Sequence, residues 1–254
     1  MAFGGRIGAA MLLAALAVAA PTCAHAQITT LDGDSEPRAI LFSGRDLWRN
    51  GIFAHGGLLL APGGVDRDGF NLKLVLSGGL YRYTGGANAG DPPGLLSGWR
   101  IVGMENALQV MPGFRVKRGA LEVKVFFGLD LENHKLWPDD PTNSLRGRSF
   151  GLRFAGEFWY EPTPTTMIAG DASLSSVGSN TSARLAYGWH MFDQFYFGPE
   201  TQVYGGDGYR QWRLGAHFTA LKTEANEWVA AAGWGRDSSG QSTPYARLGM
   251  VMRR

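Results

Sequence analysis

Residues 70–76, Phe70-Asn71-Leu72-Lys73-Leu74-Val75-Leu76, alternate between two kinds of side chain. Phenylalanine and leucine occupy the even positions, whereas asparagine, lysine and valine occupy the odd ones. Because side chains of a β-strand point alternately to its two faces, this segment predicts a strand with one apolar and one largely polar face. Such a strand suits a transmembrane barrel, whose outer face meets lipid and whose inner face meets a polar lumen.

The same alternation recurs along the chain, in segments of about the length that a tilted strand needs to cross a bilayer. From the third segment onward most connections alternate long and short, as in outer-membrane barrels with short periplasmic turns and longer external loops. The sequence therefore predicts an all-β fold, a single antiparallel up-and-down transmembrane β-barrel of about 12 strands with both termini on the periplasmic side. We expect strands near residues 39–48, 52–61, 69–83, 104–117, 120–131, 148–160, 165–175, 181–191, 195–204, 211–220, 227–236 and 244–252.

The N-terminus has the layout of a secretory signal peptide. An apolar run at 9–20, too short to span a bilayer, precedes the small-x-small cleavage site Ala24-His25-Ala26. We therefore expect residues 1–26 to be a signal peptide, residues 27–38 a flexible periplasmic leader and residues 39–254 the barrel. The single cysteine lies in the signal peptide, so no disulfide is expected.

The composition agrees with a barrel of this kind. The chain has 37 glycines, 12% aromatic residues and 18% charged residues, compared with about 25% charged residues in ordinary soluble domains. The net charge is +2, and no cluster of lysine and arginine is present that would neutralise a run of phosphates. We therefore expect no nucleic-acid partner.

Motifs of the common enzyme classes are missing. The sequence has no G-x-S-x-G elbow, no phosphate-binding G-x-x-x-x-G-K, no H-E-x-x-H and no paired cysteines. Two acidic segments, at 32–36 and 66–69, lack the ligand set of a calcium loop and are better explained as turns. We expect no enzyme activity, no catalytic residue, no cofactor and no metal.

The polar phase of the strands places charges of both signs inside the barrel. These charges either line a polar pore or pair across strands to fill a narrow lumen, and we favour the second alternative. Aromatic residues such as Trp99, Trp137 and Tyr209 are added as candidate sugar contacts because of their stacking chemistry. The candidate lumen and loop contacts are Arg115, Glu122, Lys124, Arg153, Glu157, Glu200, Arg213, His217, Trp99 and Trp137.

Three further expectations concern side-chain positions. If Arg118-Gly119 is a two-residue turn, Arg115 lies opposite Glu122 on the inner face. Charge should be far more harmful on the outer face, at Leu74, Val125 or Phe154, than on the inner face, at Val75 or Ser149. Aromatic residues near the strand ends either form interfacial girdles or reflect the general preference of aromatics for strands. They include Tyr81, Tyr83, Trp159, Tyr160, Tyr204, Trp212, Trp228 and Tyr245.

Several short motifs resemble those of the BcsS-type cellulose biosynthesis proteins, in order along essentially the whole mature chain. The motifs are Phe42-Ser43-Gly44, Asp68-Gly69, Pro138-Asp139-Asp140-Pro141, Gly198-Pro199-Glu200 and Gly215-Ala216-His217. The resemblance implies a secreted accessory protein of bacterial cellulose production in the outer membrane, with no catalytic residues. Because Pro199 has no N–H, we expect a bulge or a local break in strand pairing there.

Three functions remain open at this point. The first is a non-enzymatic outer-membrane barrel accessory to cellulose biosynthesis or export, with outer-membrane lipid, cellulose (glucan) and other cellulose-synthesis components as partners. The second is a periplasmic lipocalin-like binding barrel, which would turn its apolar face inward. The third is an outer-membrane lipid hydrolase, which would need a serine and a histidine adjacent near one rim.

Overall fold

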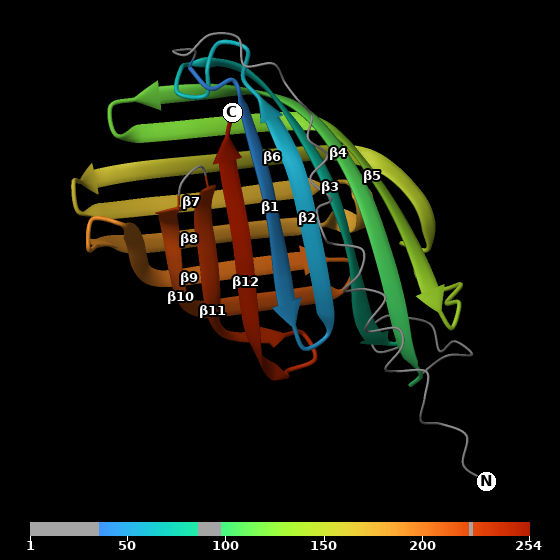
Figure 1. The fold of residues 1–254 in the computed structure, drawn as a ribbon. Helices are drawn as coiled ribbons and strands as arrows, with labels where there is room; N and C mark the ends of the chain where they lie inside the picture. The colour runs from blue at the N-terminus through green and yellow to red at the C-terminus, as the bar shows by residue number, and fades with distance from the viewer. Residues whose placement is uncertain (1–35, 86–97, 224–225) are drawn as a thin grey trace. The chain divides into compact units, whose positions relative to one another are not determined.

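The computed structural model describes residues 36–85, 98–223 and 226–254 (Figure 1). The predicted signal peptide and most of the predicted leader lie outside these residues. The described residues form twelve antiparallel strands and one short 3-10 turn, η1 (Val177–Ser179). The strands are β1 (Ala39–Trp48), β2 (Gly51–Leu60), β3 (Gly69–Thr84), β4 (Arg100–Arg118), β5 (Leu121–Trp137), β6 (Gly147–Thr163), β7 (Thr166–Ser175), β8 (Thr181–Met191), β9 (Phe195–Gly206), β10 (Tyr209–Thr223), β11 (Asn226–Asp237) and β12 (Ser242–Arg253).

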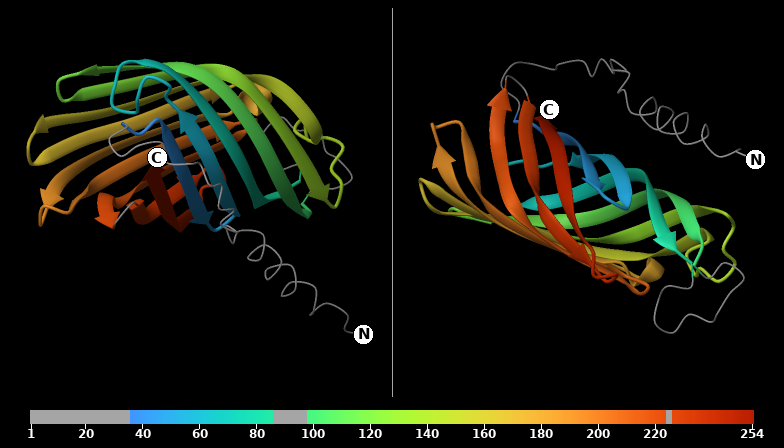
Figure 2. Two further views of the ribbon diagram at one scale, coloured as in Figure 1. Left: turned by 45° about the horizontal axis from the view of Figure 1, so that its top comes forward. Right: turned by 90° about the horizontal axis from the view of Figure 1, so that it is seen from below.

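Each strand pairs with its neighbours in the sequence, and β1 pairs with β12 to close the barrel. The views in Figure 2 show the red strand β12 beside the blue strand β1 at this closure. The predicted all-β, up-and-down barrel of about twelve strands is therefore confirmed. The largest difference in bounds is at β5, which continues to Trp137 rather than ending near residue 131. Its last residues, including Asn133 and Lys135, are polar on the outer face, so the apolar alternation that marked the strand stops before it ends.

The even number of strands brings both ends of the barrel wall to one end, which we call the terminal end. There the backbone N–H groups of Arg38 and Ala39 donate to the carbonyl of Arg254 over 2.7 and 2.8 Å. The connections from β3 to β4 and from β5 to β6 lie at the opposite end, which we call the loop end. The turn after β4 is at the terminal end and has only two residues, as the predicted alternation of short and long connections requires.

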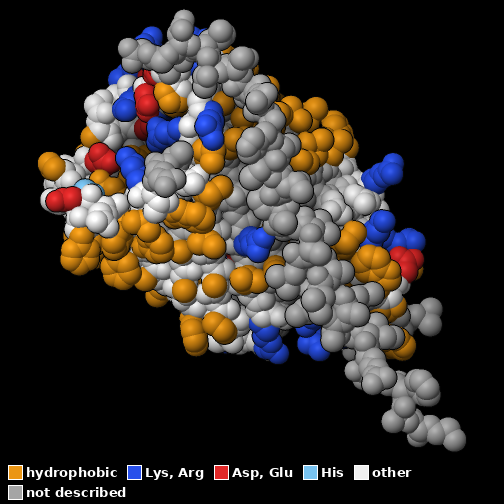
Figure 3. All heavy atoms as spheres, in the orientation of Figure 1, with side chains coloured by type: hydrophobic (Ala, Val, Ile, Leu, Met, Phe, Trp, Pro, Cys, Tyr) orange, Lys and Arg blue, Asp and Glu red, His pale blue; other side chains and the backbone are white. Residues whose placement is uncertain are grey.

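The outer surface of the barrel carries a belt of exposed apolar side chains, which we call the apolar belt. Figure 3 shows hydrophobic side chains gathered over the strands. They occupy the alternate positions that the sequence assigns to lipid, such as Phe70 (53% exposed) and Phe127 (55%). No helix within the described ranges is long and apolar enough to cross a membrane. Further members of the apolar belt are Leu41, Leu76, Leu108, Phe114, Leu121, Val125, Leu129, Leu131, Phe150, Leu152, Phe154, Leu174, Leu185, Phe197, Leu214 and Leu248.

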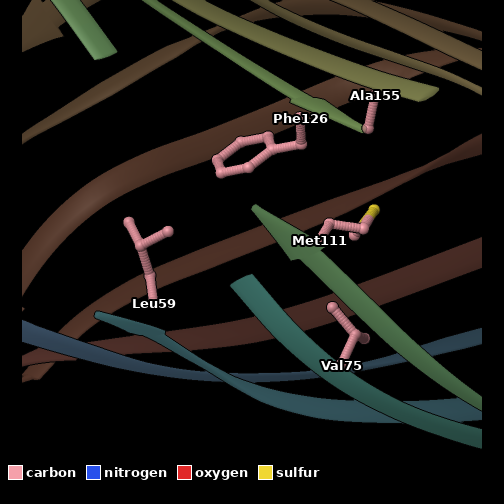
Figure 4. Close-up of a cluster of buried hydrophobic side chains, with 5 residues drawn as sticks. All are labelled: Leu59, Val75, Met111, Phe126 and Ala155. Atoms are coloured by element: carbon pink, nitrogen blue, oxygen red, sulfur yellow. The ribbon is translucent and has the colours of Figure 1, made fainter. Parts of the chain in front are cut away.

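The interior is not uniformly polar. Leu59, Val75, Met111, Phe126 and Ala155 come from β2 to β6 and form one buried apolar cluster (Figure 4). Each of these side chains is at most 9% exposed. The expectation that Val75 lies in polar surroundings is therefore wrong, because the inward face of five neighbouring strands is apolar at this position.

A second apolar cluster lies on the inward face of later strands. It contains Met167, Ala169 and Tyr196, with Trp159 and Ala220 packed against it. The Tyr196 and Trp159 rings are nearly perpendicular, at an interplanar angle of 76° and a centroid distance of 5.7 Å. Side chains from β6, β7, β9 and β10 therefore pack together inside the barrel.

Candidate functional site

One network of polar side chains in the interior is centred on Arg213 of β10. This side chain is 1% exposed, and its Nη1 lies 2.8 Å from both carboxylate oxygens of Asp46 on β1. The guanidinium also lies 5.0, 4.7 and 5.1 Å from the ring centroids of Trp48, Tyr204 and Tyr245, within range of cation–π attraction. Arg213 thus joins β10 to β1 across the two strands between them.

Glu200 of β9 is the acidic centre next to Arg213. It is 1% exposed and accepts hydrogen bonds from Arg247 on β12 and, over 3.3 Å, from Arg184 on β8. The Tyr245 hydroxyl and the Gln202 amide also donate to it. Two cations and two neutral donors therefore compensate the cost of burying this carboxylate.

A second charged network joins β3 to β6. Glu157 accepts hydrogen bonds from Lys73 and, over 3.4 Å, from Lys124. Lys124 also lies 3.0 Å from Glu122, which accepts a further hydrogen bond from the buried Arg115. Charges of opposite sign therefore pair across strands. This pairing is the arrangement expected if the charged side chains fill a narrow lumen.

The register of the β4–β5 hairpin differs from the predicted one. The turn is Gly119-Ala120, and Arg115 lies opposite Lys124 rather than Glu122. Gly119 has φ +58°, a conformation that glycine adopts at little cost, so the turn begins one residue later than predicted. The resulting shift of two residues keeps every side chain on its predicted face. Arg115 and Glu122 are therefore diagonal neighbours that still form an ion pair inside the barrel.

Arg153 organises the neighbouring part of the β5–β6 wall. Its Nη2 lies 2.7 Å from Asp130, which is 0% exposed, and 3.4 Å from Glu132. The Ser175 hydroxyl also donates to Asp130, and His134 Nε2 lies 3.1 Å from Glu132. The predicted contact Arg153 is thus part of a buried network rather than a free lumen charge.

His217 connects two of the sequence motifs, Gly198-Pro199-Glu200 and Gly215-Ala216-His217. Pro199 lies on β9 opposite the stretch of β8 near Tyr187, where the regular β8–β9 pairing is interrupted. His217 Nε2 is 3.1 Å from the Tyr187 carbonyl, and the register partner of His217 on β9 is Gly198. Because a carbonyl only accepts, Nε2 carries the proton, and Nδ1 accepts from the Thr219 hydroxyl at 2.9 Å. The predicted break in strand pairing at Pro199 is confirmed. His217 donates a hydrogen bond to the Tyr187 carbonyl, which a prolyl nitrogen could not do because it has no N–H.

Four aromatic rings form a line along the inner wall of β1, β2 and β3, which we call the aromatic row. Trp48 stacks on Phe53 at 5.3 Å, Phe53 on Tyr81 at 6.5 Å and Tyr81 on Tyr83 at 6.2 Å, with interplanar angles of 8°, 15° and 23°. The Tyr81 hydroxyl lies 3.0 Å from His134 Nδ1. Partly exposed rings beside polar groups offer apolar surface and hydrogen-bonding groups together.

Glycines of the neighbouring strands make room for this row. A Cβ on Gly79 would lie 2.4 Å from the Phe53 ring, and a Cβ on Gly103 would lie 2.2 Å from Cζ of Tyr81. Any larger residue would have to displace the ring. The glycine content of the barrel therefore has a direct steric function here.

The girdle interpretation is wrong for five of the eight aromatic residues. Tyr204 and Tyr245 contact the buried Arg213, and Trp159 packs on Tyr196 inside the barrel. The strand phase decides the direction of each ring, and closeness to a strand end does not. The inward residues are Tyr81, Tyr83, Trp159, Tyr204 and Tyr245, and the outward residues are Tyr160, Trp212 and Trp228.

The two candidate tryptophans are not part of the interior networks. Trp99 precedes β4 and is 58% exposed, and Trp137 ends β5 and is 52% exposed. Leu136 beside Trp137 is buried, so Trp137 shares the outward phase of Leu131. The other eight candidates all point into the barrel, in the networks described above.

Sequence reasoning missed important members of the interior networks. Asp46 and Trp48 were not among the candidates, although they occupy the inward phase of a strand whose outward phase holds Leu41 and Leu47. That alternation is the signal that would have found them.

The loop from β5 to β6 is anchored to the barrel through Asp140. This buried carboxylate accepts hydrogen bonds from the Tyr83 hydroxyl at 2.8 Å, and from the backbone and hydroxyl of Thr142 at 3.1 and 2.7 Å. Burial disfavours the charged form, but the hydrogen bonds from Thr142 and Tyr83 outweigh it and lower the pKa of Asp140. In the described ranges, no group of three or more His, Cys, Asp or Glu side chains is arranged to hold a metal ion.

The family described as "Cellulose biosynthesis protein BcsS" matches residues 40–254. Two solved structures have a similar fold: the COG4313 outer membrane channel from Pseudomonas putida F1, and a TodX deltaS2S3 mutant monoaromatic hydrocarbon channel. The first is 11% identical, with 89% of this chain and 98% of that chain covered and a TM-score of 0.53. The second is 7% identical, with coverages of 86% and 90% and a TM-score of 0.53. At these identities the likeness shows the fold alone. No curated protein sequence matches the chain.

Proposed function

Because the chain belongs to the family of the cellulose biosynthesis protein BcsS, we propose that it is a non-enzymatic outer-membrane barrel that assists cellulose biosynthesis or export. The apolar belt supports a position in the outer membrane, since it follows the lipid-facing phase of the strands. We further propose that residues 1–26 are a signal peptide that directs export and that the mature protein begins near Gln27.

The aromatic row is the observation that supports contact with glucan. A β-glucan chain is uncharged and presents apolar C–H faces and hydroxyl edges. Four rings in line, with His134 at hydrogen-bond distance from Tyr81, match both properties. Because Trp137 faces outward, we propose the aromatic row in its place as the glucan contact and keep Trp99 as a candidate contact at the loop end.

The two alternatives have less support. A lipocalin-like barrel would have its apolar face inward, whereas the large exposed hydrophobic side chains of this barrel are on the outside. A lipid hydrolase would require a reactive serine. The interior networks described above consist mainly of charged and aromatic side chains, so they give this alternative no support. Fractionation and a lipid-release assay separate these alternatives from the proposed function.

The test is a deletion of the gene, complemented with variants and scored for extracellular cellulose. Wild type should restore cellulose, whereas Phe53→Leu combined with Tyr81→Leu should restore much less, because stacking surface is lost while apolar volume is largely kept. The control is Phe154→Leu with Phe127→Leu, which replaces two aromatic rings by leucine on the outer face, and it should complement. A deletion strain with unchanged cellulose would contradict the proposed function. Equal complementation by wild type, the aromatic-row variant and the outer-face control would contradict the role of the aromatic row.

A further inference from the structure

Strands β5 and β6 separate at the loop end of the barrel. Their antiparallel pairing ends at Asn133 and Arg148, while β5 continues to Trp137, paired with β4 and joined to the connection by a single bridge between His134 and Arg146. A groove of about 680 Å³ lies where they part, lined by residues of both strands and of the connection between them. We call this the rim groove.

The rim groove is rich in positive charge. Lys135, Arg146 and Arg148 line it, and all three side chains are exposed. The one acidic residue among its lining residues is Asp139, whose carboxylate binds Arg146 through two hydrogen bonds of 2.6 and 2.8 Å. No carboxylate within residues 36–85, 98–223 and 226–254 forms an ion pair with Lys135 or Arg148. The groove therefore offers two cationic side chains to a ligand.

The position of the rim groove relative to the apolar belt identifies the kind of ligand. Lys135 shares the outward phase of Leu131, four residues before it on β5, which places it roughly 10 Å beyond the belt for a strand tilted by about 45°. Arg148 is two residues beyond the exposed Phe150, and Trp137 is outward at the same end, where tryptophan prefers the boundary between hydrocarbon and headgroups. Lys135 and Arg148 therefore lie at the depth of the lipid headgroups.

The positive charge continues along the outer rim beyond the groove. Arg82 near the end of β3 and Arg100 at the start of β4 are exposed on the outward phase. Four consecutive strands therefore present a cation at this rim. The terminal end also carries exposed cations, such as Lys117 and Lys222, but there the outward Arg118 binds Asp68 and the exposed Arg67 binds Glu36.

We propose that the rim groove binds the phosphate group of an anionic lipid in the outer leaflet, with Lys135 and Arg148 as the charged donors. Arginine and lysine are the usual partners of phosphate, and a lipid reaches the groove directly from the apolar belt. A neutral glucan would gain nothing from the two cations. The inference rests on the proposed position in the outer membrane and assigns the loop end to the outer leaflet.

The test compares binding of bisphosphorylated lipid A to the full mature protein in phosphatidylcholine vesicles. Wild type should bind lipid A with an affinity that falls as salt rises. The variant Lys135→Gln with Arg148→Gln should bind roughly 25-fold more weakly, since each cation near a lipid surface contributes about five-fold, or about 1 kcal/mol. Arg67→Gln with Arg118→Gln removes two exposed cations at the terminal end and should retain wild-type affinity.

Two outcomes would overturn the proposal. One is equal affinity of the groove variant and wild type. The other is displacement of lipid A by inorganic phosphate at equal phosphate concentration, which would show a site for free phosphate instead of a lipid. Folding of each variant is checked by its heat-modifiable mobility on gels, and if the double variant fails to fold, Arg148→Gln alone decides, with a five-fold loss expected. Normal complementation of cellulose by a variant that has lost lipid A binding would leave the proposed function intact.

Discussion

Replacing Val125 by arginine should destabilise the barrel by about 2–4 kcal/mol, the cost of an arginine at mid-bilayer on the lipid face. The outward apolar residues of β5 run from Leu121 to Leu131, a distance of ten residues. At about 3.4 Å per residue and a tilt of about 45°, they span roughly 24 Å, close to the height of the hydrocarbon-facing band of such barrels. Val125 lies one residue from the middle of this span and is 44% exposed. Its arginine variant would therefore sit about 2 Å from the bilayer centre, where the penalty is largest.

The comparison substitution on the inner face is Ser149→Arg. Ser149 lies opposite Glu132 on the inward phase, so the new guanidinium has a carboxylate beside it. The measurement is the urea dependence of the folded fraction in lipid vesicles, read from heat-modifiable gel mobility. Val125→Arg should lower the folding equilibrium constant roughly 30- to 700-fold, and Ser149→Arg should change it far less. Equal losses at the two sites would refute the face assignment and the transmembrane barrel with it.

The structure changes one comparison that the sequence suggested. Val75 faces inward, but it belongs to the apolar cluster with Met111 and Phe126. Val75→Arg would bury a charge among apolar side chains, so its cost should be comparable to that of Val125→Arg despite the opposite face. The same urea titration tests this, and tolerance of arginine at Val75 would contradict the packing of that cluster.

Three further results are expected. Arg213→Met should destabilise the barrel by about 3–5 kcal/mol, because it leaves the Asp46 carboxylate without its partner, and adding Asp46→Asn should recover part of this in the same urea titration. Gly103→Ala should displace the Tyr81 ring, since the new Cβ would lie 2.2 Å from it, and titration with cello-oligosaccharides should show weaker binding; unchanged affinity would contradict the role of the aromatic row. Because the pKa of Asp140 is lowered in the folded protein, its stabilisation of the loop is present at neutral pH and is lost as the pH falls through that pKa. The protection factors of the amides in residues 138–146, taken relative to the intrinsic exchange rate at each pH, should fall in acid, and Asp140→Asn should make them low and independent of pH there.

The sequence by itself determined the strands and the face to which each side chain points. The alternation in residues 70–76 needs no partner strand to be visible, because successive side chains of a strand always point to opposite faces. The same local rule placed Arg115, Glu157 and Arg213 inside the barrel. The five inward aromatic residues, Tyr81 and Tyr204 among them, were misplaced because closeness to a strand end was used in place of this rule.

Contacts between strands were decided by the tertiary structure alone. Arg213 and Asp46 are 167 residues apart and meet because the barrel closes between β1 and β12. Whether Arg115 lies opposite Glu122 or Lys124 depends on a single turn residue, since a shift of two leaves every face unchanged. The inward apolar surroundings of Val75 and the aromatic row likewise require the register of several strands at once. A pattern with period two records the direction of a side chain, but it carries no information on the height at which that side chain meets the neighbouring strands.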